Sequence, residues 1–114
     1  MTYTPKQTTE YEKLVRASYT AVSKMFFYKN IPLEISIIAL FSVPQNISKK
    51  LKNSMLKGDI LPTKKPDSDN IIKIILDALN GICYHDDSKI CRIYFEKKYS
   101  EIPKVEITIK EIVL

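Results

Sequence analysis

The feature that most constrains this chain is an acidic motif at the point where an amphipathic helix is expected to begin. Residues 66–70 read Pro-Asp-Ser-Asp-Asn, and apolar residues recur behind them at helical spacing. This spacing predicts a helix with one buried face, formed by Ile71, Ile74, Ile75, Ala78 and Leu79. Ser68 or Asp69 can cap its N-terminus, and Gly81 suits the left-handed residue that follows a helix.

A second set of polar residues lies on another face of the same helix. Asp69, Lys73 and Asp77 recur at four-residue intervals, and Asn70 lies beside them. A further acidic pair follows the helix at positions 86–87. Carboxylates that converge beside a lysine are typical of a Mg²⁺-dependent site that cleaves phosphodiester bonds, because Mg²⁺ prefers oxygen ligands.

Each of these residues also has a purely structural interpretation. Asp67 and Asp69 could simply cap the helix. Lys73 could pair with a carboxylate one turn away, an interaction worth only about 0.3–0.5 kcal/mol. Asp77 could be a metal ligand, a partner of Lys73 or a buried structural acid, and the pair at 86–87 could form a turn. The complete spacing favours the nuclease-type site over these alternatives.

The complete pattern resembles the signature of the RusA family of Holliday junction resolvases. The similarity is strong over residues 62–96 and rests on the motifs at 66–70, 77–81 and 84–90 together with Lys73. A weaker similarity to the family's first helix involves Tyr3, Thr4, Pro5, Thr9, Tyr11 and Glu12. Members of this family are small, dimeric, Mg²⁺-dependent DNA endonucleases, typically carried by phages and prophages.

The resemblance implies specific roles for the acidic residues. It implies that Asp67, Asp69 and Asp87 are catalytic metal ligands and that Lys73 is an essential catalytic lysine. Accessory roles are possible for three neighbours: Asn70, Asp77 and Asp86. It also implies Mg²⁺ as the cofactor, four-way junction DNA as the substrate and a homodimer that makes paired symmetric nicks during DNA recombination and repair.

Two departures from the family pattern leave an alternative open. Lys89 stands where the family commonly has glutamine. The chain also begins at the Tyr-Thr-Pro element, whereas family members usually carry a first strand and a loop rich in proline and arginine before it. We therefore keep a second hypothesis, a catalytically inactive, N-terminally truncated module that binds junction DNA.

The basic residues favour contact with phosphates. The net charge is +5, and the positive side chains are lysines except for Arg16 and Arg92. Lysine acts as a point charge, whereas arginine reads base edges with two hydrogen bonds. The densest basic run supplies the predicted DNA-binding residues Lys49, Lys50, Lys52, Lys64 and Lys65. The alternative is an ordinary solvated surface.

Length and composition exclude several other classes. A chain of 114 residues is expected to form one domain, 1–114, and no apolar run is long enough for a membrane helix, so we expect a cytoplasmic protein. Cys83 and Cys91 are expected to be reduced, partly buried thiols. His85 is expected to be an exposed neighbour of the metal site. With only two glycines, the chain has no glycine loop for phosphate.

The predicted elements give an α+β fold, with helices on one face of a small mixed or antiparallel sheet. They are a helix over 6–29, a strand over 31–43, a short helix over 45–55, the motif helix, and strands over 89–99 and 104–113 that form a hairpin. The segment Lys64-Lys65-Pro66 is predicted to be an extended arm. Five apolar residues exceed what one short domain can cover and favour a dimer: Phe26, Phe27, Tyr28, Ile38 and Leu40.

Overall fold

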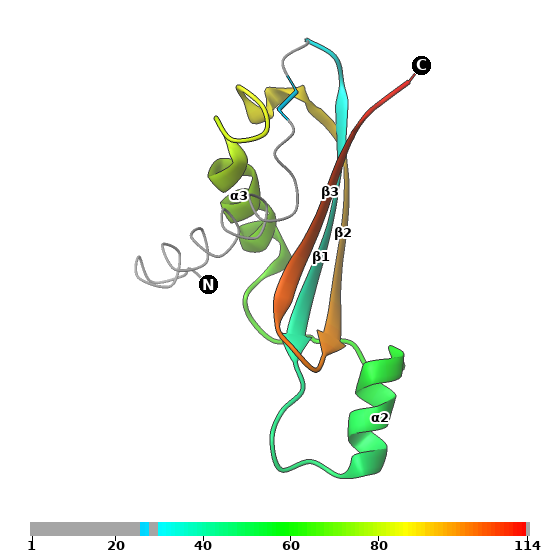
Figure 1. Ribbon diagram of the computed structural model, residues 1–114. Helices are drawn as coiled ribbons and strands as arrows, with labels where there is room; N and C mark the ends of the chain where they lie inside the picture. The colour runs from blue at the N-terminus through cyan, green and yellow to red at the C-terminus, as the bar shows by residue number, and fades with distance from the viewer. Residues whose placement is uncertain (1–25, 28–29, 114) are drawn as a thin grey trace.

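The computed structural model describes residues 26–27 and 30–113 (Figure 1). Its elements are strand β1 (Leu33–Ser42), helix α2 (Lys49–Lys57), helix α3 (Ser68–Leu79), the 3₁₀ turn η1 (Asp87–Lys89), strand β2 (Ile90–Ser100) and strand β3 (Lys104–Glu111). The predicted α+β class with a small mixed sheet is confirmed. No helix in this part of the chain is long and apolar enough to cross a membrane.

The three strands are ordered β2-β1-β3, so β1 is central. It pairs in parallel with β2, where Ile35 faces Ile93, and antiparallel with β3, where Ile37 faces Ile107. The predicted hairpin between β2 and β3 is therefore wrong. The most apolar strand lies between the other two, because only a central strand has its backbone hydrogen-bonded on both sides.

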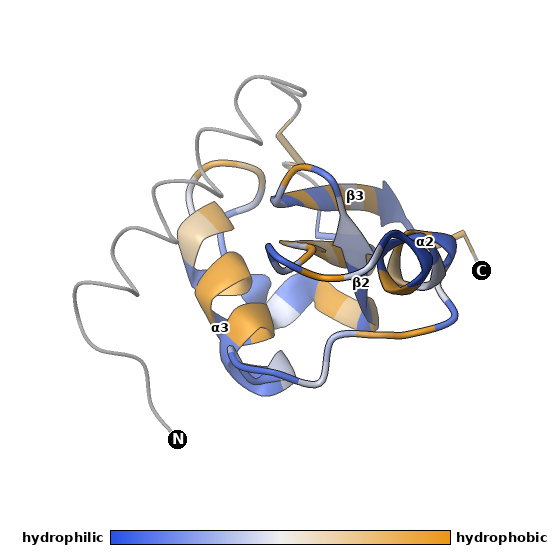
Figure 2. Cartoon of the chain, turned by 90° about the horizontal axis from the view of Figure 1, so that it is seen from below, coloured by the Kyte–Doolittle hydropathy of each residue, from blue (hydrophilic) through white to orange (hydrophobic). Residues whose placement is uncertain are grey.

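The core lies between α3 and one face of the sheet. All five residues predicted for the buried face of α3 are buried. Four of them, Ile71, Ile75, Ala78 and Leu79, pack in one cluster with alternate residues of β1. The buried residues of β1 are Leu33, Ile35, Ile37 and Ala39, as predicted. Phe41 is half-buried, and Val43 lies beyond the end of the strand. Figure 2 shows α3 coloured as hydrophobic along much of its length beside the sheet.

The other face of the sheet is polar at its surface. An ion pair joins Lys110 of β3 to Glu34 of β1 (3.1 Å), and a second joins Lys98 to Glu96 along β2 (3.0 Å). Ile38 and Leu40 are half-buried on this face. The predicted excess of apolar surface is therefore wrong for this face and carries no argument for a dimer.

The predicted helix over 6–29 is wrong at its C-terminal end. Phe27 is buried and forms an isolated β-bridge with Tyr84, and its amide N–H donates to the carbonyl of Cys83 at 2.8 Å. Its side chain is thus part of the core and not an excess apolar surface. Tyr28, most of the predicted helix and the segment from Tyr3 to Glu12 lie outside the described residues.

Helix α2 begins four residues later than predicted and ends as predicted at Gly58. Ser48 is the N-cap, and its Oγ accepts a hydrogen bond from the Leu51 amide at 3.1 Å. Gly58 has φ 91°, the left-handed conformation that glycine adopts at low cost, and its N–H donates to Met55. Asn46 at φ 61° keeps the residues before Ser48 out of the helix.

Candidate active site

The acidic motif begins α3. Asp67 is the N-cap, with φ −65° and ψ 148°, and its carbonyl accepts the Ile71 amide at 3.0 Å. The predicted caps Ser68 and Asp69 lie inside the first turn, so that prediction is wrong by one or two residues. The carboxylate of Asp67 makes no capping hydrogen bond. Capping therefore does not account for the carboxylates of this motif.

The polar face of α3 is open. Asp69, Lys73 and Asp77 are all exposed, and Asn70 is half-buried beside them. Lys73 forms no ion pair with either aspartate among the residues described. The structure thus excludes Asp77 as a buried structural acid and does not support Lys73 as an intrahelical ion-pair partner. The exposed side chains of Asp69, Lys73 and Asp77 are therefore accessible to a ligand.

The second acidic pair lies after the other end of α3. Asp86 is the N-cap of η1, and its Oδ2 accepts the Ser88 amide at 3.3 Å. Hydrogen bonds from the side chain and backbone of Ser88 hold the pKa of Asp86 below its ordinary value. Asp87 follows as the half-buried first residue of η1. Asp86 therefore has a local structural role, which leaves Asp87 as the better candidate for a ligand.

Tyr84 anchors this end of the helix. Its ring is fully buried, and its hydroxyl donates to the carbonyl of Leu76 at 3.0 Å. Burial raises the pKa of Tyr84 far above its ordinary value, and Cys83 together with three carboxylates reinforces the shift: Asp87, Asp77 and Asp86. The hydroxyl consequently stays protonated and structural. Asp77 lies in the last turn of α3, and Asp86 and Asp87 follow shortly after the helix.

The two acidic groups are separated by the length of the helix. The twelve residues of α3 span about 18 Å at the usual rise. Since α3 connects the parallel strands β1 and β2, its N-terminus faces the end of the sheet where both strands finish, and residues 86–87 lie where β2 begins (Figure 1). Within the described part of the chain, no three His, Cys, Asp or Glu residues are grouped so that they could hold a metal ion.

The separation of the two acidic groups determines whether the predicted ligands of one chain can surround a single Mg²⁺ ion. Asp67 and Asp69 are brought together in the first turn region of α3, whereas Asp87 is not brought to them. The three carboxylates of one chain therefore do not fit around a single ion.

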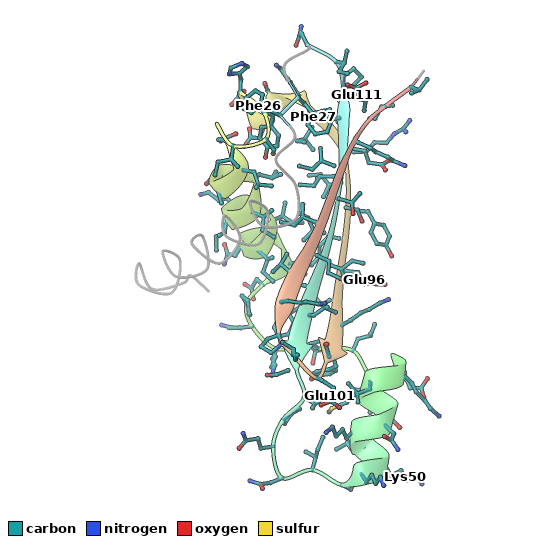
Figure 3. All side chains as sticks on the ribbon, viewed as in Figure 1. Phe26, Phe27, Lys50, Glu96, Glu101 and Glu111 are labelled. Carbon is teal, nitrogen blue, oxygen red and sulfur yellow. The ribbon has the colours of Figure 1, made fainter. Side chains whose placement is uncertain are left out.

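The predicted DNA-binding lysines lie towards the first of these two ends. Lys49, Lys50 and Lys52 belong to α2, which lies beyond the C-terminal ends of β1 and β2 (Figure 1). Figure 3 shows Lys50 at the outer end of α2, far from Phe26 and Phe27 at the opposite end of the molecule. Lys52 pairs with Glu101 at 3.4 Å. Lys64 and Lys65 are exposed in the segment that enters α3.

Lys97 is a residue of this region that the sequence analysis missed. Its Nζ donates to the carbonyls of Lys64 (2.7 Å) and Pro66 (3.1 Å) and lies 5.1 Å from the centre of the Phe41 ring. These bonds fold residues 64–66 against β2, so the predicted extended arm is wrong. The sequence contains one signal for this role, because Lys97 lies on the same face of its strand as Phe95 and Tyr99.

A small pocket of about 190 Å³ adjoins this contact. It is lined by residues of β1, β3 and the segment before α3, among them Phe41, Lys64 and Pro66. Lys64 Nζ lies 5.8 Å from the centre of the Phe41 ring and 5.9 Å from that of Tyr99. The approach to the acidic motif is thus basic and partly aromatic, a combination that suits a nucleic acid.

Four further predicted residues lie nearer the second acidic pair. His85 is exposed, as expected, and packs edge-on against Phe26 with ring centres 4.9 Å apart. Both cysteines are free thiols; Cys83 is buried, but Cys91 is exposed and not partly buried as predicted. Lys89 ends η1 and is half-buried.

Comparison with known proteins gives a match to one family over nearly the whole chain. The model of the family described as Endodeoxyribonuclease RusA matches residues 1–110. A relative in Lactococcus phage r1t, the crossover junction endodeoxyribonuclease rusA, is 31% identical over 90 residues, which cover 78% of this chain and 62% of that protein. The uncharacterized protein YqaN of Bacillus subtilis (strain 168) is 40% identical over 83 residues, which cover 71% of this chain and 58% of that protein. The matched regions thus span about three fifths of the length of these curated relatives.

Proposed function

The chain belongs to the RusA family of endodeoxyribonucleases, and we propose on this basis that it is a structure-specific endonuclease that resolves Holliday junctions. The observation that carries the proposal is the open polar face of α3. Asp69 and Lys73 are exposed, and among the described residues they form no ion pair with each other. Such residues contribute little to the stability of the fold, so a functional role explains them better.

The proposed catalytic residues are Asp67, Asp69, Asp87 and Lys73, with Mg²⁺ as the cofactor. Lys73 would stabilise the negative charge that develops on the scissile phosphate. Asn70, Asp77 and Asp86 are proposed as accessory residues. The domain is proposed to comprise residues 1–114, and a DNA substrate agrees with a cytoplasmic location.

The proposed DNA contacts are made by the lysines at the α2 end: Lys49, Lys50, Lys52, Lys64 and Lys65. Their charges suit the phosphates of branched DNA without reading its sequence. A homodimer is proposed because a four-way junction has two-fold symmetry and its resolution needs two symmetric nicks.

A second function is favoured by one observation. The described part of a single chain does not gather its carboxylates around one ion, which is what a catalytically inactive junction-binding module would also show.

A nicking assay separates the two functions. The purified chain is incubated with a synthetic four-way junction with and without Mg²⁺, and binding to the same DNA is measured in EDTA. The resolvase makes Mg²⁺-dependent symmetric nicks on the junction and leaves linear duplex intact. Binding without any nick at millimolar Mg²⁺ would favour the inactive module instead.

A further inference from the structure

We propose that the pocket beside the entry to α3 binds one nucleobase of the DNA, taken out of its stack at the branch point of the junction. The inference rests on the proposed nuclease function and adds to it a means of distinguishing branched DNA from linear duplex. The pocket is lined by Phe41, Lys64 and Pro66, and Pro66 directly precedes Asp67. A ligand in the pocket therefore lies beside the acidic motif.

The lining of the pocket suits a flat apolar ring that is joined to anionic groups. Ala39 and Val105 line it and are buried members of the core, and Phe41 packs against the same core. Two lysines, Lys64 and Lys104, line it as well, and among the residues described no acidic residue does. A nucleotide within a DNA strand offers both parts that this lining requires, a base with two apolar faces and phosphates for the ammonium groups.

The pocket is large enough for one base. An apolar cavity of about 150 Å³ can hold a benzene ring. The volume of about 190 Å³ here therefore suits one heterocycle and not a stacked pair, so the base must have left its stack. Removing a base from a duplex costs least where stacking and pairing are already interrupted. The branch point of a four-way junction is such a place.

The wall of the pocket next to Asp67 is fixed before any ligand binds. Lys97 Nζ donates to the carbonyls of Lys64 (2.7 Å) and Pro66 (3.1 Å), so a bound base does not have to order this segment. The Lys64 ammonium lies 5.8 Å from the centre of the Phe41 ring, and its side chain is exposed. Because a contact of this kind is weak at an exposed site, the ammonium can move to a phosphate when a base stacks on Phe41.

Photocrosslinking of the wild-type protein tests which group enters the pocket. 5-Iodouracil replaces thymine at one position at a time around the branch point, and the complex is irradiated in EDTA so that no strand is cut. Near-ultraviolet light couples this base to an aromatic side chain that it contacts. We expect a crosslink to Phe41 from a branch-point position and none from the same base within a duplex arm. Absence of a Phe41 crosslink from every branch-point position would overturn the proposal.

The substitution Phe41→Leu tests what the ring contributes to selectivity. It keeps an apolar side chain beside the core but removes the stacking surface. Binding of the junction should weaken by about 5- to 150-fold, the loss that corresponds to one aromatic stacking partner. Binding of linear duplex should stay unchanged, because its bases remain stacked. The matched control is Phe95→Leu, which changes another phenylalanine packed against the core but outside the pocket lining, and it should alter neither affinity.

The outcomes separate this inference from the proposed nuclease function. Wild-type protein that nicks junctions while Phe41→Leu keeps the full preference for them would overturn the base pocket and leave the nuclease in place. Equal losses in the Phe41 and Phe95 variants would also overturn it. A Phe41→Leu variant that loses mass in light scattering but keeps its preference for junctions would assign the pocket to a second copy of the chain instead. A Phe41 crosslink in wild-type protein that makes no nicks would support the pocket and count against the nuclease.

Discussion

At the scale of single residues, helical periodicity predicted the polar face of α3. Residues four positions apart share one face of any α-helix, so their grouping depends only on their spacing in the sequence. Asp69, Lys73 and Asp77 lie on one turn after another whatever the rest of the fold does. Lys97 could not be found in this way. Its partners Lys64 and Pro66 are 33 and 31 positions away in the sequence, and only the packing of β2 beside the entry to α3 brings them together.

We expect Asp69→Asn to abolish cleavage and to leave junction binding unchanged or stronger. The carboxylate is proposed to serve metal binding, whereas its charge repels the phosphates of bound DNA. Nicking assays and gel-shift titrations of the same junction measure the two effects. Asp59→Asn, an exposed aspartate outside the motif, is the matched control and should behave as the wild type. Full cleavage by the Asp69 variant at ordinary Mg²⁺ concentration would contradict the site assignment.

Lys97→Met should lower the free energy of unfolding by about 1–3 kcal/mol, because hydrogen bonds to a charged group are lost while the aliphatic stem is kept. The segment before Asp67 should also lose its fixed position, so cleavage should fall more than binding. Urea denaturation and nicking assays measure these effects. The control is Lys98→Met, the neighbour that faces the other side of the sheet and pairs with Glu96. Equal effects of the two substitutions would argue against a special role for Lys97.

At the scale of helices and strands, local signals predicted the existence of each described element better than its partners. The capping residue Ser48 and the left-handed Gly58 delimit α2, and both are visible in the sequence. Local signals did not predict the order of the strands. Only three residues join β2 to β3, and yet these strands lie on opposite sides of β1. A short connection predicts a hairpin, and only competition for the central position overrides it.

The segment from α2 to α3 is expected to carry the contacts with phosphates. Each phosphate neutralised adds about 0.9 to the slope of log affinity against log salt concentration. Replacing Lys64 and Lys65 together by alanine should therefore flatten this slope for branched DNA by about 0.9 if one phosphate contact is lost and by about twice as much if both are lost. The control removes Lys98 and Lys110, which pair with glutamates on the polar face of the sheet, and should change the slope less. An unchanged slope in the first variant would make the segment an ordinary solvated surface.

At the scale of the whole molecule, the sequence predicted the set of acidic residues but not their separation. Spacing along the chain suggested that Asp67 and Asp87 converge. The parallel crossover from β1 through α3 to β2 instead places them at opposite ends of one helix. This outcome depends on the direction in which β2 pairs with β1, which no local pattern encodes.

We therefore expect the chain to be a dimer at micromolar concentration, with twice the mass of one chain in light scattering. The reason is the two-fold symmetry of the proposed junction substrate, because two symmetric nicks need two active sites. The apolar surface of the sheet gives no argument for a dimer. Both nicks should then occur within the lifetime of one complex, so a cruciform plasmid should be converted to linear product with little open circular intermediate. A chain that scatters as a monomer and still makes paired nicks would show that a dimer is not needed.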